Sequence, residues 1–117
     1  MPAITESQLK LQTSQYLQIL ENQGKLIWLR LNAGGIVIEG EKRRYFQGVK
    51  PGCADFLVLK RASITRYYDS CQAIFIETKS TDGRQSQKQK DFQVLVERQG
   101  AAYHIVKSLE DIERILE

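Results

Sequence analysis

The chain has 117 residues, of which 42% are hydrophobic and 26% charged, and its formal net charge at pH 7 is +3. These values are typical of one folded domain, exclude disordered and collagen-like proteins, and slightly favour an anionic partner. No apolar run approaches the roughly 20 residues that span a bilayer, and the first residues lack the layout of a secretion signal, so we expect a cytoplasmic protein without a membrane partner.

The N-terminal segment is predicted to form a helix over residues 6–22. Thr5, followed three residues later by Gln8, is a capping-box pattern, and Gly24 marks the end of the helical periodicity. The residues that repeat at helical spacing between them are Leu9, Thr13, Tyr16, Leu17 and Leu20.

The next part of the chain is predicted to be mostly strands. Residues 25–32 and 36–39 are apolar or alternating and flank an Ala-Gly-Gly turn, which predicts a hairpin between them. The basic and aromatic residues 41–46 predict a further short strand, and a Gly/Pro turn then leads to an apolar strand at 56–59. Residues 61–71 show no clear periodicity and are predicted to be a loop or a short excursion.

The second half predicts a strand, a helix, a strand and a closing helix. Residues 72–79 are a strand, and a second capping box, Ser86 with Gln89, begins a helix that reaches Gly100. Residues 101–106 are an apolar strand, and Ser108 with Asp111 begins the last helix. We therefore predict an α/β fold in one domain, with a mixed sheet flanked on both faces by helices and the order α-β-β-β-α-β plus a C-terminal helix.

Two acids stand at the ends of predicted strands. Asp55 precedes an apolar strand, where a carboxylate loses solvation and needs a cation, a donor or a proton. Glu77 and Lys79 share a face near the end of the strand at 72–79, and the two acids meet if these strands pair antiparallel. Close carboxylates favour a shared proton or a divalent cation such as Mg²⁺. A solvated strand end with a cross-strand ion pair is the simpler alternative for Glu77 and Lys79.

Two helical residues are candidates for the same site. Glu6 lies three residues before Leu9, on the core-facing side of the first helix, although an acid in the first turn is also favoured by the helix dipole. Gln89 lies three residues before Phe92 on the later helix, and its alternative role is to close the capping box.

Several segments resemble the motifs of the VRR-NUC (virus-type replication-repair nuclease) domain, a branch of the PD-(D/E)XK superfamily. They are residues 52–55 (GCAD), 75–79 (FIETK) and 84–89 (RQSQKQ), and residues 29–34 are similar to the R-x-N-x-G hairpin segment of that family. The resemblance extends over nearly the whole chain. One departure is Ala54, where the family commonly has the proline that precedes the aspartate.

The resemblance implies a restriction-endonuclease-like fold and a Mg²⁺-dependent, structure-selective DNA endonuclease, with Mn²⁺ as a substitute. It implies 5′-phosphate and 3′-hydroxyl products and substrates similar to Holliday junctions. Asp55 and Glu77 would be metal ligands together with the carbonyl of Thr78, and Glu6 would be a further ligand. The catalytic residues would be Asp55, Glu77, Lys79 and Gln89, with Lys79 as the catalytic lysine and Gln89 as a supporting residue.

Contacts to DNA phosphates are predicted in three basic segments that flank these motifs. The expected residues are Arg30, Asn32, Lys42, Arg43, Arg44, Lys50, Arg84 and Lys88. Residues 42–44 could instead be a solvated strand edge that is kept basic against aggregation. We also expect a homodimer, because two copies related by a twofold axis suit paired cuts in symmetric branched DNA.

Two other functions remain open from the sequence. One is a nuclease-fold protein that binds nucleic acid without cutting it, and the other is a sequence-specific restriction-type endonuclease. Cys53 and Cys71 lack zinc-site spacing and are expected to be reduced thiols. The single histidine, His104, is expected to be an ordinary strand residue rather than a catalytic base.

Overall fold

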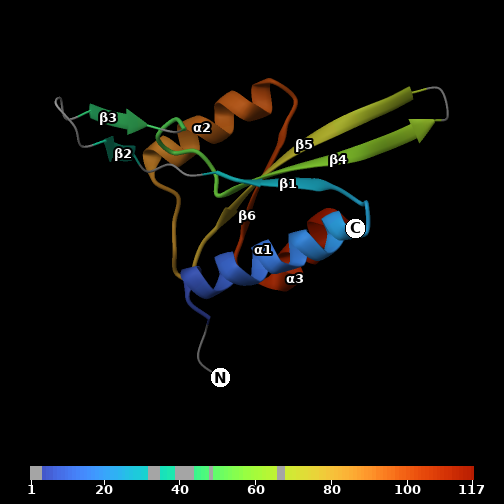
Figure 1. Cartoon of the computed structure of the whole chain (residues 1–117), viewed down its shortest axis with the longest axis horizontal. Helices are drawn as coiled ribbons and strands as arrows, with labels where there is room; N and C mark the ends of the chain where they lie inside the picture. Colours follow the sequence, from blue (N-terminus) through green and yellow to red (C-terminus); the bar gives the residue numbers. More distant parts are fainter. Residues whose placement is uncertain (1–3, 32–34, 39–43, 48, 66–67) are drawn as a thin grey trace.

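In the residues that the structure describes, the protein has an α/β fold with three helices and a four-stranded mixed sheet (Figure 1). The computed structural model describes residues 4–31, 35–38, 44–47, 49–65 and 68–117. The elements are α1 (Glu6–Asn22), β1 (Ile27–Arg30), β2 (Gly35–Ile38), β3 (Arg44–Gln47), β4 (Phe56–Thr65), β5 (Tyr68–Thr78), α2 (Gln87–Arg98), β6 (Ala102–Val106) and α3 (Leu109–Leu116).

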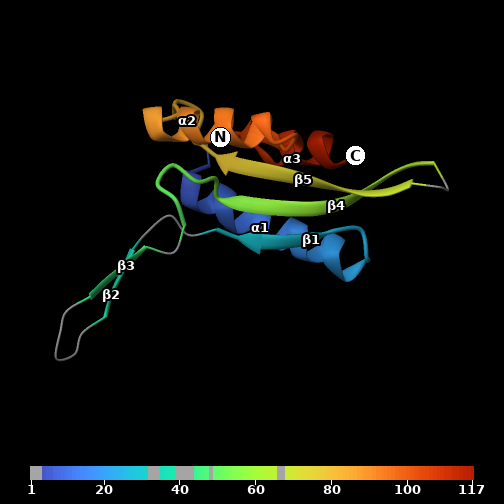
Figure 2. The same ribbon diagram turned by 90° about the horizontal axis from the view of Figure 1, so that it is seen from above.

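The main sheet has the strand order β1-β4-β5-β6. Strand β4 is antiparallel to β1 and to β5, whereas β6 is parallel to β5. Strands β2 and β3 form a separate antiparallel ribbon that lies to one side of the main sheet (Figure 2). Without this ribbon the order is α-β-β-β-α-β-α, as predicted.

Two predictions about the strands are wrong. The segment at 25–32 does not form a hairpin with the segment at 36–39, because β1 pairs with β4 and β2 pairs with β3. Burial explains the choice of partner, since β1 is anchored beside β4 by the core residue Leu26 and by Trp28, whose ring packs 5.9 Å from that of Phe56. Residues 61–65 and 68–71 are not a loop but belong to the strands β4 and β5, which pair antiparallel. Arg61, Ser70 and Cys71 are exposed in these strands, so this part of the sequence lacks the apolar alternation that identifies a strand.

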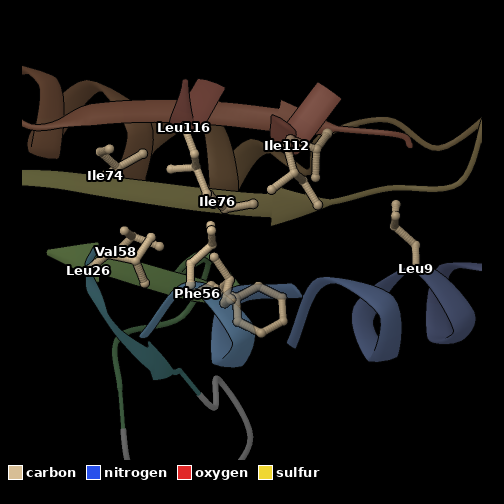
Figure 3. Close-up of a cluster of buried hydrophobic side chains, with 11 residues drawn as sticks. Leu9, Leu26, Phe56, Val58, Ile74, Ile76, Ile112 and Leu116 are labelled. Atoms are coloured by element: carbon tan, nitrogen blue, oxygen red, sulfur yellow. The ribbon is translucent and has the colours of Figure 1, made fainter. Parts of the chain in front are cut away.

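The hydrophobic core lies between the main sheet and the helices α1 and α3 (Figure 3). Alternate residues of the central strands face this layer. The buried side chains that form it are Leu9, Leu17, Leu20, Leu26, Phe56, Val58, Ile74, Ile76, Val106, Ile112 and Leu116. Helix α2 covers part of the opposite face, where the ring of Phe92 packs between those of Phe75 and Tyr103 at 5.3 and 6.3 Å. Each face carries a helix, but the α2 face is covered less completely.

The helix ends follow the local sequence. The predicted capping boxes are both present, Thr5 with Gln8 at the start of α1 and Ser86 with Gln89 at the start of α2. The Ser108 side chain caps α3. Both cysteines are free, as expected. Among the described helices, none is long and apolar enough to cross a membrane.

Candidate metal centre

Three acidic side chains meet where β4 begins and β5 ends. Phe56 pairs with Ile76 in the antiparallel register, so Asp55 and Glu77 face each other one position further along. The first residue of α1, Glu6, reaches the same place. One carboxylate oxygen from each of these three residues lies within 4.8 Å of the other two. The predicted approach of Asp55 and Glu77 is therefore present in the structure, together with Glu6.

The carboxylate of Asp55 is held by contacts to both of its oxygens. Oδ2 accepts hydrogen bonds from the backbone N–H of Thr78 at 2.9 Å and from its hydroxyl at 2.6 Å. Oδ1 lies 3.6 Å from Lys10 Nζ and 3.4 Å from Arg30 Nη1. Because Thr78 is fully buried at the end of β5, it fixes Asp55 against the strand that carries Glu77.

The two oxygens of Glu77 have different surroundings. Oε1 accepts a hydrogen bond from Gln89 Nε2 at 2.9 Å and lies 3.8 Å from Lys79 Nζ. Oε2 is buried and has no hydrogen-bond partner in the described part of the chain. Burial and the neighbouring charge of Asp55 raise the pKa of this carboxyl to about 7, although Lys79 and Lys10 act in the opposite direction.

The side chain of Gln89 makes a contact that suits each of its two predicted roles. Its Oε1 accepts a hydrogen bond from the backbone N–H of Ser86 at 2.9 Å, which completes the capping box. Its Nε2 donates to Glu77. The first turn of α2 is thus connected directly to the acidic cluster.

This arrangement fits a hard divalent cation. Mg²⁺ prefers oxygen ligands and is usually bound by one or two carboxylates together with waters. The cluster offers three carboxylates, and Oε2 of Glu77, which has no hydrogen-bond partner among the described residues, is a buried acceptor that a cation would satisfy. Leaving a buried charged acceptor without a partner is costly, so this atom is a specific reason to consider a metal.

The residues predicted to contact DNA are only partly described. Arg30 belongs to the acidic cluster, since its Nη1 donates to the backbone carbonyl of Asp55 at 2.7 Å. Lys50, Arg84 and Lys88 are exposed. The remaining predicted residues, Asn32, Lys42, Arg43 and the side chain of Arg44, lie outside the described residues.

One contributor to the cluster was not predicted, and another makes contacts that were not predicted. Lys10 lies 3.6 Å from the carboxylates of both Glu6 and Asp55, and its position four residues after Glu6 on one helix was the available signal. Thr78 was expected to contribute its carbonyl, whereas its amide and hydroxyl are what hold Asp55. No local pattern reveals this role, which depends on the pairing of β4 with β5.

Comparison of the chain with protein-family models, with curated proteins and with solved structures gives no match.

Proposed function

We propose that this chain is a Mg²⁺-dependent endonuclease that hydrolyses phosphodiester bonds in branched DNA. The proposal depends on one observation: three carboxylates, from α1, from the residue before β4 and from β5, converge within 4.8 Å beside Lys79, and one buried oxygen among them has no hydrogen-bond partner in the described part of the chain. Close carboxylates with an adjacent ammonium group suit metal-assisted phosphoryl transfer.

The fold supports the same assignment. The main sheet with its helices has the order α-β-β-β-α-β, and the acids gather where β4 begins and β5 ends. We interpret this as a restriction-endonuclease-like core of the PD-(D/E)XK type, in a single VRR-NUC-like domain over residues 1–117. The ribbon of β2 and β3 is then an insertion between the first two strands of that core.

In this proposal, Asp55 and Glu77 hold the metal with Glu6 and the carbonyl of Thr78, and Mn²⁺ can replace Mg²⁺. The bound ion would offset negative charge on the phosphoryl oxygens and make a bound water more acidic.

The other residues of the site orient these ligands and the reacting groups. The hydroxyl of Thr78 fixes Asp55, and the amide of Gln89 fixes Glu77. Lys79 is largely buried beside Glu77, so its ammonium group is positioned to orient the attacking water or to stabilise charge that develops on the phosphate.

Binding of DNA would come from the basic residues around this end of the sheet. Lys50, Arg84 and Lys88 are exposed on the loop before β4, the loop before α2 and the first turn of α2. Contacts of this kind are made mainly to phosphates, so they select the shape of DNA rather than its sequence. We therefore favour branched substrates similar to Holliday junctions, cut by a homodimer that places one site on each of two strands.

The test is cleavage of labelled linear, flap, splayed and four-way DNA by the purified protein in Mg²⁺, in Mn²⁺ and in chelator. We expect metal-dependent cleavage that is strongest on branched DNA. Asp55→Asn and Lys79→Ala should each lower the rate by at least about 100-fold, the usual effect of removing a group that acts on the transition state.

The matched controls are Asp82→Asn and Lys25→Ala, which change the same charges at exposed positions outside the acidic cluster. They should cleave like the wild type. Binding of branched DNA without cleavage would favour the non-cutting alternative, and full activity of Asp55→Asn would contradict the assigned roles.

A further inference from the structure

We propose that Lys10 is a built-in competitor of the divalent ion: its ammonium group lies against Glu6 and Asp55 in the metal-free protein and moves into solvent when the ion binds. This inference rests on the proposed metal site. It assigns to Lys10 a role in setting the affinity for metal, not a role in the chemical step.

The position of Lys10 is the first reason. Its Nζ lies 3.6 Å from Glu6 Oε1 and 3.6 Å from Asp55 Oδ1. These two carboxylates, with that of Glu77, are the groups whose oxygens converge within 4.8 Å. The ammonium group and a bound cation would therefore interact with the same carboxylates at close range.

The freedom of Lys10 to leave is the second reason. Its side chain is 33% exposed, whereas that of Lys79 is 13% exposed. Its two ion pairs are long, and weak, partly exposed pairs of this kind cost little to break. Lys10 lies on α1, where rotation about its side-chain bonds is enough to carry the ammonium group into water.

The other two cations of the cluster are held differently. Arg30 donates from Nη1 to the backbone carbonyls of Leu31 and Asp55 at 3.0 and 2.7 Å, and its guanidinium lies 5.0 Å from the ring centroid of Phe56. Lys79 contacts the carboxylate of Glu77, not those of Glu6 and Asp55. Among the described residues that form ion pairs in the cluster, Lys10 is the cation that contacts two of its three acids.

The charges explain why such a competitor is useful. Three carboxylates repel one another, and Lys10, Arg30 and Lys79 together neutralise them in the absence of metal. A divalent ion brings two further positive charges and therefore repels the ammonium group of Lys10. Because the side chain of Lys10 can rotate, its ammonium group moves into solvent while the ion stays bound to the carboxylates. Lys10 thus stabilises the metal-free cluster and weakens metal binding by the same interaction.

The direct test is calorimetric titration of Mn²⁺ into wild-type and Lys10→Met protein at about pH 8.5, above the pKa of about 7 of the Glu77 carboxyl. Methionine keeps much of the aliphatic side chain and removes the charge. We expect a Kd that is between about 2-fold and 30-fold lower in Lys10→Met, the range that corresponds to the loss of two weak ion pairs. Lys10→Gln should behave in the same way and replaces Lys10→Met if that variant folds poorly.

The matched control is Lys25→Met, which makes the same change of charge at an exposed lysine after the far end of α1. Its Kd should equal that of the wild type. If Lys10→Met binds Mn²⁺ no more tightly than the wild type, the inference is wrong while the metal site stands. If the wild-type protein binds no Mn²⁺ at all, the metal site and the inference both fail.

A second measurement uses the wild-type protein alone. Acetylation of lysine side chains, followed by mass spectrometry, reports how freely each amine reaches solvent. Addition of Mn²⁺ should increase the labelling rate of Lys10 by at least about 2-fold, because the ammonium group is released from its two ion pairs. The rate of Lys25 should stay constant, and an unchanged rate at Lys10 in the metal-bound protein would also overturn the inference.

Discussion

The carboxylate of Glu77 is bonded on one side only. Gln89 and Lys79 approach Oε1, while Oε2 is buried without a partner among the described residues. The glutamate itself is only 3% exposed. Burial of a carboxylate favours its protonated form, so the folded protein holds the Glu77 proton to a higher pH than the unfolded chain does.

This difference predicts how Glu77→Gln changes stability in chelator. The pKa of Glu77 rises from an ordinary 4.5 to about 7 on folding, so ionisation of Glu77 destabilises the fold. This loss of stability is absent below pH 4.5 and complete above pH 7. Glutamine does not ionise. We therefore expect the free energy of unfolding of Glu77→Gln, relative to wild type, to increase by about 1–3 kcal/mol between those limits.

Urea unfolding at several pH values across this range measures the effect. Glu97→Gln, which neutralises an exposed acid on α2, is the control and should show no such change. A difference between Glu77→Gln and wild type that is independent of pH would show that Glu77 has the same pKa in the folded and unfolded chains.

The helices could be predicted from the sequence more reliably than the pairing of the strands. A capping box joins residues only three positions apart, so Thr5 with Gln8 and Ser86 with Gln89 identify the starts of α1 and α2 from local sequence. Strand pairing depends on distant residues. Trp28 lies beside Val58 in the sheet, and the Ala-Gly-Gly turn suggested a nearer partner that β1 does not use.

In the candidate site, too, some contacts could be predicted from the sequence and others could not. Asp55 and Glu77 could be predicted to meet because each stands at the polar end of an apolar strand and the strands are antiparallel. The hydrogen bonds from Thr78 to Asp55 could not be predicted, because they depend on the orientation of the Asp55 side chain just before β4 begins. The DNA contacts stay a prediction for all of the expected residues, and Asn32, Lys42, Arg43 and the side chain of Arg44 also lie outside the described residues.

Gly52 lies in the loop that carries Asp55, at the point where this loop packs against the helix that carries Gln89. Its φ of +81° lies in the left-handed region, which glycine adopts without strain. A Cβ at this position would lie 2.3 Å from the backbone oxygen of Lys88 and 2.9 Å from the backbone nitrogen of Gln89. The loop thus packs directly on the first turn of α2, and only glycine leaves room for that contact.

We expect Gly52→Ala to destabilise the protein more than Gly24→Ala does. Gly24 also has a positive φ, of 76°, but nothing lies within 4 Å of its Cβ position, so alanine there meets only the backbone strain of about 1–2 kcal/mol. At Gly52 the steric clash with α2 should add roughly 1–3 kcal/mol. Urea unfolding of both variants measures the difference, and equal losses would contradict the close packing of the loop on α2.

The two faces of the main sheet are covered to different extents. Helices α1 and α3 bury one face, whereas α2 covers the other near β5 and β6 (Figure 1). The outer part of the second face carries Ile27 and Leu29, which are 56% and 48% exposed, beside their half-buried partners Leu59 and Leu57. We call these four residues the open apolar face. Adjacent apolar side chains that remain exposed are typical of interaction surfaces.

The proposed homodimer would use the open apolar face, because apolar residues can pack against their own copies across a twofold axis without charge repulsion. Light scattering at micromolar concentration should then give twice the chain mass of 13.5 kDa. The double variant Ile27→Glu/Leu29→Glu should dissociate at least about 100-fold more readily, since each of these side chains contributes roughly 1.5–3 kcal/mol when buried.

Cleavage of four-way DNA then distinguishes loss of the dimer from loss of catalysis, because the three acids and Lys79 come from a single chain. The monomeric variant should still nick branched DNA but should no longer make paired cuts within one encounter. Leu11→Glu/Ile19→Glu is the control, with two equally exposed apolar residues on α1, and it should remain dimeric and make paired cuts. A wild-type protein with the mass of one chain, or equal dissociation of both double variants, would argue that the open apolar face does not join two copies.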